Sequence, residues 1–352
     1  MKAKLKQLIG KFPRLYYLTY CTFNMNSTRF RERVLEIKTN PFQLHFENHG
    51  QLYDKKIIYR IVVGDETKGF CSAIRDTLYY LMYADALGIL PYVEYTDNIP
   101  YYEEKKINGS NNPFEYYFLQ PYGINLNEVN SCRVCANAET VHMEGVFNLY
   151  GLKQPETYYT NEPEYIKISA EMYRKYIKLN DKVQTEIDSD IQRLLKNKTI
   201  GVHYRGTDFK VGYNGHPTVV RAENHIAEVN KLLKTGRYEY IFLATEDGDV
   251  IELFKDEFGD KLLMYTDVVR GTGNTNAYNM KVNRENHHYL LGYEVLRDVY
   301  TLAECDAFVS SNSGVGITSQ IVRQSNGKNF DFCKVFEEGI NQNNNVLQRN
   351  SY

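Results

Sequence analysis

The chain has 352 residues, of which 43% are apolar and 24% are charged, and its formal net charge is -2. This length supports two ordinary domains and is too great for one small module. The chain is not basic overall, and its sequence has no zinc-finger spacing, RNP-like motif or stripe of basic residues. These features argue against a nucleic-acid-binding protein.

The N-terminus and the cysteines predict a cytoplasmic protein. The sequence contains no run of about 18 apolar residues, the length that a helix needs to span a bilayer. The first residues also lack the pattern of a signal peptide. The six scattered cysteines do not resemble a disulfide framework. Residues 1–14 are basic, and their apolar members are spaced to share one side of a helix. Such a segment can lie on the anionic inner face of a membrane, and a solvated terminus is the alternative.

The first clear elements form a strand–helix–strand unit. Residues 57–63 predict a strand, and residues 73–87 place apolar side chains at helical spacing. Gly88 suits the position after a helix end, and residues 91–95 predict the next strand. A glycine turn at Gly69 precedes the helix. It is a weak phosphate-loop signal, because the G-x-G-x-x-G spacing is missing.

The middle of the chain gives fewer signals. Residues 100–150 are rich in Tyr, Asn and Pro, which predicts long loops with short elements, and residues 163–198 predict helix. We place the domain junction directly after this helical stretch. The expected organisation is therefore an N-terminal domain over 1–195, a second domain over 196–330, and a C-terminal tail over 331–352.

The second half alternates strands and helices, as a doubly wound nucleotide-binding domain does. The expected strands cover residues 199–204, 240–244, 262–265 and 307–309. The expected helices cover residues 222–233, 249–258, 293–303 and 317–323. In such sheets the ligand lies beyond the carboxyl ends of the strands, so the polar residues at those ends are candidates for a site.

The first strand end carries His203, Arg205 and Asp208. His203 and Arg205 are two residues apart, so their side chains project to the same face. The planar fork of an arginine can hold a phosphate through two hydrogen bonds and stays charged at any working pH. Asp208 can orient that arginine. The alternative is a structural Arg–Asp ion pair beside a core histidine.

Two further strand ends carry polar residues. Thr245, Glu246 and Asp247 follow the second strand. Their hydroxyl and two carboxylates can accept hydrogen bonds from a ribose or a base, and the alternative is that Asp247 or Asp249 caps the next helix. Asp247 and Asp249 together could also bridge a magnesium ion to a nucleotide, but we favour the helix cap over this metal site. The segment 310–316 follows the last strand, and its glycines and hydroxyls can direct backbone N–H groups at an anion, or form a plain polar loop.

Together these clusters resemble a specific family. The sequence has His-x-Arg-x-x-Asp from His203, then His216-Pro217, then Phe-Leu-Ala-Thr-Glu-Asp over 242–247, then Leu-Arg-Asp-Val over 296–299, and Asp-Ala-Phe-Val-Ser-Ser over 306–311. This order is similar to that of the α1,6-fucosyltransferase superfamily, which includes core N-glycan and nodulation-factor enzymes and related protein O-fucosyltransferases. The resemblance is clearest over residues 199–322, which look like the donor-binding half of these enzymes. The unit over 69–94 is similar to their acceptor-side domain less specifically, and residues 100–195 match only loosely.

The resemblance implies an α/β protein of the GT-B class, with two Rossmann-like domains facing a central cleft, and inverting, metal-independent chemistry without a cofactor. Arg205 would hold the β-phosphate of a GDP-sugar and stabilise the departing GDP, with Asp208 in support. The other implied donor-site residues are His203 and Asp298 at the guanine, Ser311, Ser313 and Gly314 at the pyrophosphate, and Thr245 and Asp247 near the ribose or base.

One departure concerns the general base. The core N-glycan enzymes place a carboxylate in the loop before His-Pro, whereas residues 210–215 here contain no acid. Either the base comes from the other domain, with Glu115, Glu103 and Asp76 as possibilities, or departure of the leaving group dominates and no strong base is needed.

The resulting hypothesis is an inverting transfer of L-fucose from GDP-fucose to a glycan hydroxyl. One alternative is the same fold with another GDP-sugar, such as GDP-mannose. Another is an inactive protein that binds sugar nucleotides or glycans. A cytoplasmic enzyme with a basic terminus would fit the biosynthesis of a surface polysaccharide.

Overall fold

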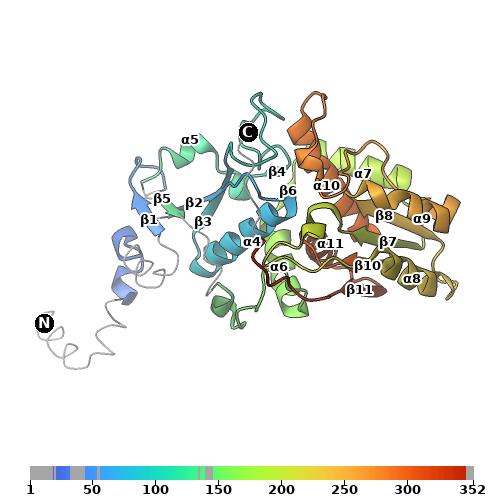
Figure 1. Ribbon diagram of the computed structural model, residues 1–352. Helices are drawn as coiled ribbons and strands as arrows, with labels where there is room; N and C mark the ends of the chain where they lie inside the picture. Colours follow the sequence, from blue (N-terminus) through green and yellow to red (C-terminus); the bar gives the residue numbers. More distant parts are fainter. Residues whose placement is uncertain are drawn as a thin grey trace, which may run out of the picture.

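The computed structural model describes residues 19, 21–31, 44–53, 56–133, 135–138 and 146–345. The basic segment 1–14 lies outside these residues. Within them the chain forms two α/β units that lie side by side, each with its own mainly or wholly parallel sheet (Figure 1). The predicted α/β class, with two sheet units as in GT-B proteins, is confirmed.

The N-terminal unit contains the expected strand–helix–strand. Strand β2 (Ile58–Val63) is followed by helix α4 (Phe70–Leu87) and then by strand β3 (Leu90–Tyr95), which pairs in parallel with β2. Gly88 ends the helix at a φ of 65°, a left-handed conformation that favours glycine. Two further strands, β5 (Cys135–Ala138) and β1 (Leu44–Glu47), complete the order β1-β5-β2-β3.

The middle of the chain has the long loops and short elements that the sequence predicts over 100–150. Its short elements are β4 (Phe118–Leu119), η1 (Pro121–Gly123), α5 (Leu126–Val129) and η2 (Phe147–Tyr150). The helical stretch is two helices, α6 (Pro163–Tyr176) and α7 (Asp181–Leu194), separated by β6 (Lys178–Leu179). The interruption has a local cause: β6 pairs with β4, and the side chain of Asn180 caps α7 by accepting from the Val183 N–H.

The C-terminal unit is a five-stranded parallel sheet in the order β11-β10-β7-β8-β9. Its strands are β7 (Thr199–Tyr204), β8 (Tyr240–Thr245), β9 (Leu262–Leu263), β10 (Ala307–Ser311) and β11 (Phe332–Phe336). Its helical elements are η3 (Thr207–Val211), α8 (Ala222–Leu233), η4 (Gly248–Val250), α9 (Ile251–Phe258), η5 (Gly259–Lys261), η6 (Ala277–Asn279), α10 (His287–Glu304) and α11 (Gly314–Ser325).

Two elements of this unit depart most from the prediction. The expected tail begins with β11, which pairs in parallel with β10 as the edge strand of the sheet. Helix α10 begins at His287, earlier than the expected 293, because the backbone N–H of Leu290 already bonds to the Asn286 carbonyl.

Every residue of β7 is buried, since helices cover both faces of the sheet. The side chains of α8 and α9 pack on one face with Ile200, Val202 and Leu243. On the other face Phe242 and Phe308 pack with Leu302 of α10.

A tyrosine-rich core joins the two units. Helices α4 and α6 from the first half of the chain pack with α10 and α11 from the second half, and Tyr79, Tyr117 and Tyr173 lie in this common core. The shared packing fixes α4 relative to the C-terminal sheet, which matters for the site described next.

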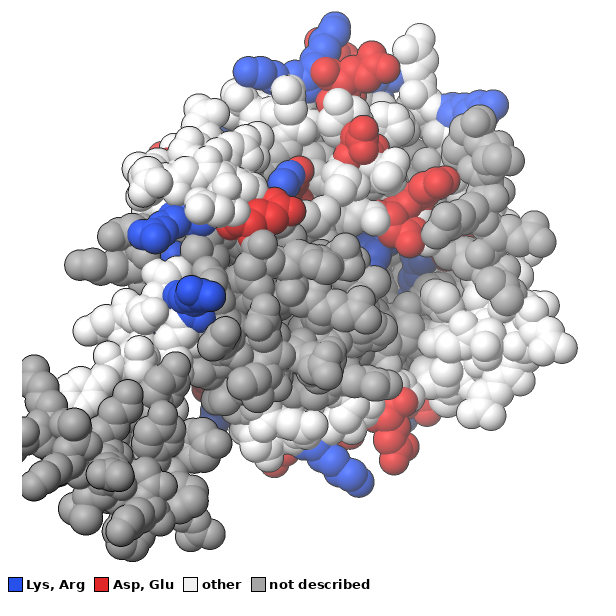
Figure 2. Space-filling view, turned by 90° about the vertical axis from the view of Figure 1, so that its left-hand side faces the viewer, with Lys and Arg blue, Asp and Glu red and all other residues white. Residues whose placement is uncertain are grey.

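On the face shown in Figure 2, the described lysine and arginine side chains lie interspersed with aspartate and glutamate. Of the helices in the described part of the chain, none combines the length and the apolar character that crossing a bilayer requires.

Candidate functional site

A pocket of about 170 Å³ lies at the carboxyl ends of the C-terminal strands, between the two units. The chain runs from β7 to β8 and β9 on one side, whereas β10 and β11 lie on the other side of β7. This reversal next to β7 is the topological switch point, where open α/β sheets bind ligands. The predicted residues that line the pocket are His203, Arg205, Asp208, Thr245, Asp298, Ser313 and Gly314.

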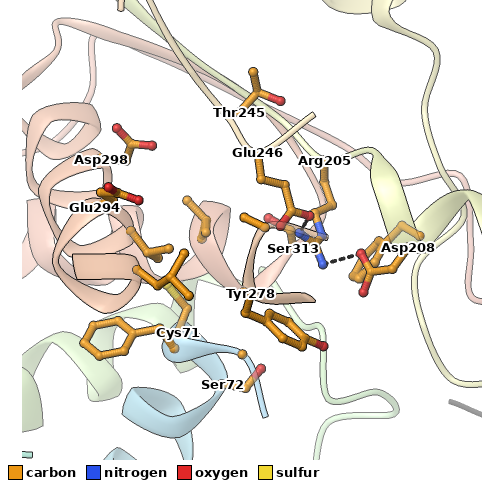
Figure 3. Close-up of a pocket in the computed structure, with 18 of the residues that line it drawn as sticks. Cys71, Ser72, Arg205, Asp208, Thr245, Glu246, Tyr278, Glu294, Asp298 and Ser313 are labelled. Carbon is orange, nitrogen blue, oxygen red and sulfur yellow. Dashed lines mark hydrogen bonds and ion pairs between the residues drawn. The ribbon is translucent and has the colours of Figure 1, made fainter. Parts of the chain in front are cut away.

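Arg205 is the cation that the C-terminal strands present to the pocket. One terminal nitrogen donates to Asp208 Oδ1 at 2.6 Å, and the other pairs with Glu246 (Figure 3). The guanidinium lies over the Phe209 ring, 4.4 Å from its centroid. The side chain is only 19% exposed, so two carboxylates and a ring hold the fork in one orientation. The ion pair considered from the sequence therefore exists, and it faces the pocket.

A tight turn brings these carboxylates together. Gly206 approaches Asp247 so closely that a Cβ at this position would collide with its carboxylate. Thr207 follows with a φ of 46°, a conformation that is strained for a β-branched residue. Its hydroxyl lies 2.5 Å from Glu246 Oε1 and 3.1 Å from Asp208 Oδ1. The strained turn thus positions both partners of Arg205.

His203 is buried behind Arg205. Its Nδ1 lies 3.2 Å from Ser313 Oγ and 3.4 Å from Ser310 Oγ. Burial, with Arg205 nearby, lowers the pKa of His203 to about 3. The imidazole is therefore neutral at any working pH and can serve a ligand as a hydrogen-bonding group without adding charge.

Asp298 and Glu294 lie one turn apart on α10 and face the pocket from its other side (Figure 3). Glu294 pairs with Arg284 and accepts from the Val269 N–H. Among the described residues, the Asp298 carboxylate has no hydrogen-bond partner. Burial raises its pKa to about 7, although Arg297 and Arg270 act in the opposite direction.

The other wall of the pocket comes from the N-terminal unit. Gly69, Phe70, Cys71 and Ser72 at the start of α4 line it, opposite Gly314 at the start of α11. A Cβ on Gly314 would lie 3.3 Å from the Cys71 Cβ, so glycine permits the two helix ends to approach. Both helices direct their N-termini at the same pocket, and helix N-termini attract anions.

Two predicted contact residues lie beneath the pocket instead of lining it. Asp247 is fully buried: it caps η4 by accepting from the Asp249 N–H at 3.0 Å, and it pairs with Lys210 at 2.7 Å. Ser311 Oγ lies 3.0 Å from His225 Nε2 and 3.3 Å from the Arg205 N–H. Neither residue lines the pocket in this structure, and their direct contacts with a ligand stay a prediction.

The three candidates for a general base also lie off the pocket. Glu115 accepts from Ser110 and Gln120, at 2.5 and 2.8 Å. Glu103 accepts from the Tyr289 N–H. Asp76 pairs with Lys68 and accepts from the Tyr158 hydroxyl. Each carboxylate thus has a structural role, and none of them faces the donor-side residues.

Several pocket residues, or the roles they have, were not predicted. Glu294 stands four residues before Asp298, so helical spacing could have indicated it. Glu246 belongs to the predicted cluster after the second strand, but as an acceptor for a ribose or base and not as a partner of Arg205. Tyr278 comes from η6 and Cys71 from α4 of the other unit, and no local pattern of the sequence connects either of them to the pocket.

Among the described residues, no three His, Cys, Asp or Glu side chains are grouped in a way that could hold a metal ion.

No protein-family model and no curated protein matches the chain. Among solved structures, it is similar to the NodZ α-1,6-fucosyltransferase soaked with GDP-fucose, with 13% identity and a TM-score of 0.44 over 76% of this chain and 93% of that one. It is also similar to fucosyltransferase NodZ from Bradyrhizobium, with 14% identity and a TM-score of 0.43 over 76% of this chain and 93% of that one. A third similar structure is POFUT1 in complex with GDP, with 12% identity and a TM-score of 0.46 over 80% of this chain and 98% of that one.

Proposed function

We propose that the protein is an inverting, metal-independent glycosyltransferase that transfers L-fucose from GDP-fucose to a glycan hydroxyl. The observation that carries this proposal is the polarity of the pocket. One side offers Arg205 and the N-termini of α4 and α11, while the other offers the carboxylate of Asp298, which has no hydrogen-bond partner in the described part of the chain. GDP has the matching polarity, with anionic phosphates at one end and the N1–H and N2–H donors of guanine at the other.

Arg205 suits the leaving group. As the glycosidic bond breaks, charge grows on the β-phosphate, and a cation held in place beforehand stabilises it without reorganisation. Asp208 and Glu246 pair with different nitrogens of the guanidinium, so a phosphate oxygen can replace Glu246 while Asp208 keeps the fork oriented. Ser313 and Gly314 would line the pyrophosphate at the start of α11.

The proposal of metal independence rests on what the acidic residues already bind. Asp247 accepts hydrogen bonds from two backbone N–H groups and pairs with Lys210, while Asp249 accepts from the Gly273 N–H. Both carboxylates thus already have protein partners, and Arg205 supplies positive charge where a bridging cation would otherwise be required.

Donor choice can be tested by thermal unfolding with sugar nucleotides. GDP and GDP-fucose are expected to stabilise the fold by roughly 2–4 kcal/mol at about a hundred to a thousand times Kd, because only the folded state binds them. UDP and CMP-sugars should stabilise it far less. Equal stabilisation by a UDP-sugar would contradict the guanine assignment. A preference for GDP-mannose over GDP-fucose would select the alternative donor on the same site.

A further inference from the structure

His216 lies in the same pocket, on the loop between η3 and α8. Its imidazole packs edge-on against Phe209, with centroids 5.3 Å apart, and contacts the rings of Tyr159 and Tyr213 at 5.8 and 5.9 Å. The Phe209 ring also contacts the Arg205 guanidinium. One aromatic ring therefore separates His216 from the group that we assign to the leaving phosphate.

The backbone of His216 is fixed by the C-terminal segment. The backbone N–H and the side-chain amide of Asn341 both donate to the His216 carbonyl, at 2.9 and 3.1 Å. The His216 N–H donates to the Tyr213 carbonyl at 3.1 Å. With three rings around the imidazole, this arrangement holds a pocket side chain in one place, as a reacting group requires.

One ring nitrogen of His216 is available to a ligand. Nδ1 lies 3.4 Å from the Asn214 carbonyl oxygen, which can only accept, so Nδ1 carries the proton. The lone pair of the neutral ring is then on Nε2, and no described residue donates to it. A neutral histidine whose tautomer is fixed by a carbonyl is equipped to take a proton.

Burial keeps the ring neutral at physiological pH, and the charges around it act in both directions. Burial lowers the pKa of His216 below its ordinary value, and Arg205 at the end of β7 lowers it further. The Asn214 carbonyl and Asp208 of η3 act in the opposite direction. The remaining neighbours with titratable groups are the phenols of Tyr159 and Tyr213, which are uncharged at neutral pH.

We propose that His216 is the general base of the transfer reaction, a role that rests on the proposed function. Its Nε2 takes the proton of the acceptor hydroxyl while that oxygen forms a bond to the anomeric carbon of the donor. The bond from that carbon to the β-phosphate oxygen breaks, and its electron pair leaves with GDP. The imidazolium then returns the proton to solvent. This histidine supplies the base that the acid-free loop 210–215 lacks.

The test compares His216→Gln with wild type, with His288→Gln as the matched control. His288 also donates from Nδ1 to a backbone carbonyl, that of Pro100, but it lies on the surface outside the pocket. The readout is the rate of GDP release from GDP-fucose as a function of pH. It is measured with water alone as the acceptor and with the nitrophenyl glycoside that gives the fastest transfer. GDP affinity and Tm are measured on all three proteins.

At saturating GDP-fucose, loss of a general base should lower kcat of His216→Gln by roughly 10²–10⁴-fold and remove the acidic limb of kcat plotted against pH. GDP affinity should stay near that of wild type, and imidazole in solution should restore part of the activity of His216→Ala. The control should retain both the rate and the acidic limb.

The outcomes separate two failures. A His216→Gln protein that keeps its kcat and its acidic limb would refute the base and leave the transferase standing. A lower Tm with an unchanged acidic limb would mean a structural role and would also refute the base. A wild type that binds no GDP, or releases none from GDP-fucose, would overturn the proposed function and the base with it.

Discussion

Arg205→Lys is expected to fold normally and to lose roughly two to three orders of magnitude in kcat, as an enzyme does when a preorganised charge-stabilising donor is removed. Lysine keeps the charge but has no planar fork. Its single nitrogen therefore cannot reproduce the geometry in which one guanidinium nitrogen bonds Asp208 and the other bonds a phosphate oxygen. Arg205→Ala should lose more. It would leave Asp208 and Glu246 facing the pocket without a cation, and their charge would repel GDP.

Arg297→Lys is the matched control for this experiment. Arg297 also pairs with two carboxylates, Asp190 and Asp267, and lies over a ring, that of Tyr265, but it does not line the pocket. Its lysine variant should lower Tm and leave kcat within a few-fold of wild type. If Arg205 were only the structural partner of Asp208, Arg205→Lys would behave like this control. Steady-state kinetics and Tm measured together on the variants decide between the two roles.

Asp298→Asn is expected to weaken GDP binding by roughly tenfold to a hundredfold, the usual effect of losing a hydrogen bond to a charged group. An amide offers guanine one acceptor where the carboxylate offers two. In wild type the affinity for GDP should fall as the pH drops below about 7, because the protonated acid accepts poorly from two N–H donors. The variant should lose this pH dependence. Calorimetric titration with GDP between pH 5.5 and 8.5 measures both effects.

The same carboxylate predicts a change in stability without ligand. The folded pKa of about 7 lies above the ordinary value of 3.8, so the folded protein binds this proton more tightly than the unfolded chain does. That contribution is fully present below about pH 4 and is lost as the pH rises to about 7. The Tm of Asp298→Asn should therefore exceed that of wild type increasingly across this window, and then by a constant amount. An affinity that is independent of pH, with no gain in Tm, would contradict the assignment of Asp298.

Regular segments of the C-terminal sheet were predictable because local pattern and burial agree there. Residues 199–204 and 222–233 have the predicted bounds: β7 is buried along its length, and α8 keeps one apolar face. The edge strand β11 was missed, because its partly exposed side chains give no alternation clear enough to distinguish a strand from a polar tail.

The site was predictable only in part. Arg205 and Asp208 could be located because strand ends in parallel sheets mark a ligand site. Asp298 lies on helix α10, and only the family resemblance indicated it. The motif could not distinguish a ligand contact from a helix cap at Asp247, because both roles require the same acceptor at the same position. Cys71 reaches the pocket through the packing of α4 on the C-terminal helices, a long-range contact that no local pattern encodes.

The central claim is tested most directly by following labelled fucose from GDP-fucose to a panel of nitrophenyl glycosides, in a buffer that contains EDTA. The account predicts a fucosylated glycoside with inverted anomeric configuration, formed by the wild type and lost with Arg205→Ala. Product that forms only after Mn²⁺ is added, or only from a sugar nucleotide other than GDP-fucose, would contradict it, as would tight binding of GDP-fucose without transfer to any acceptor.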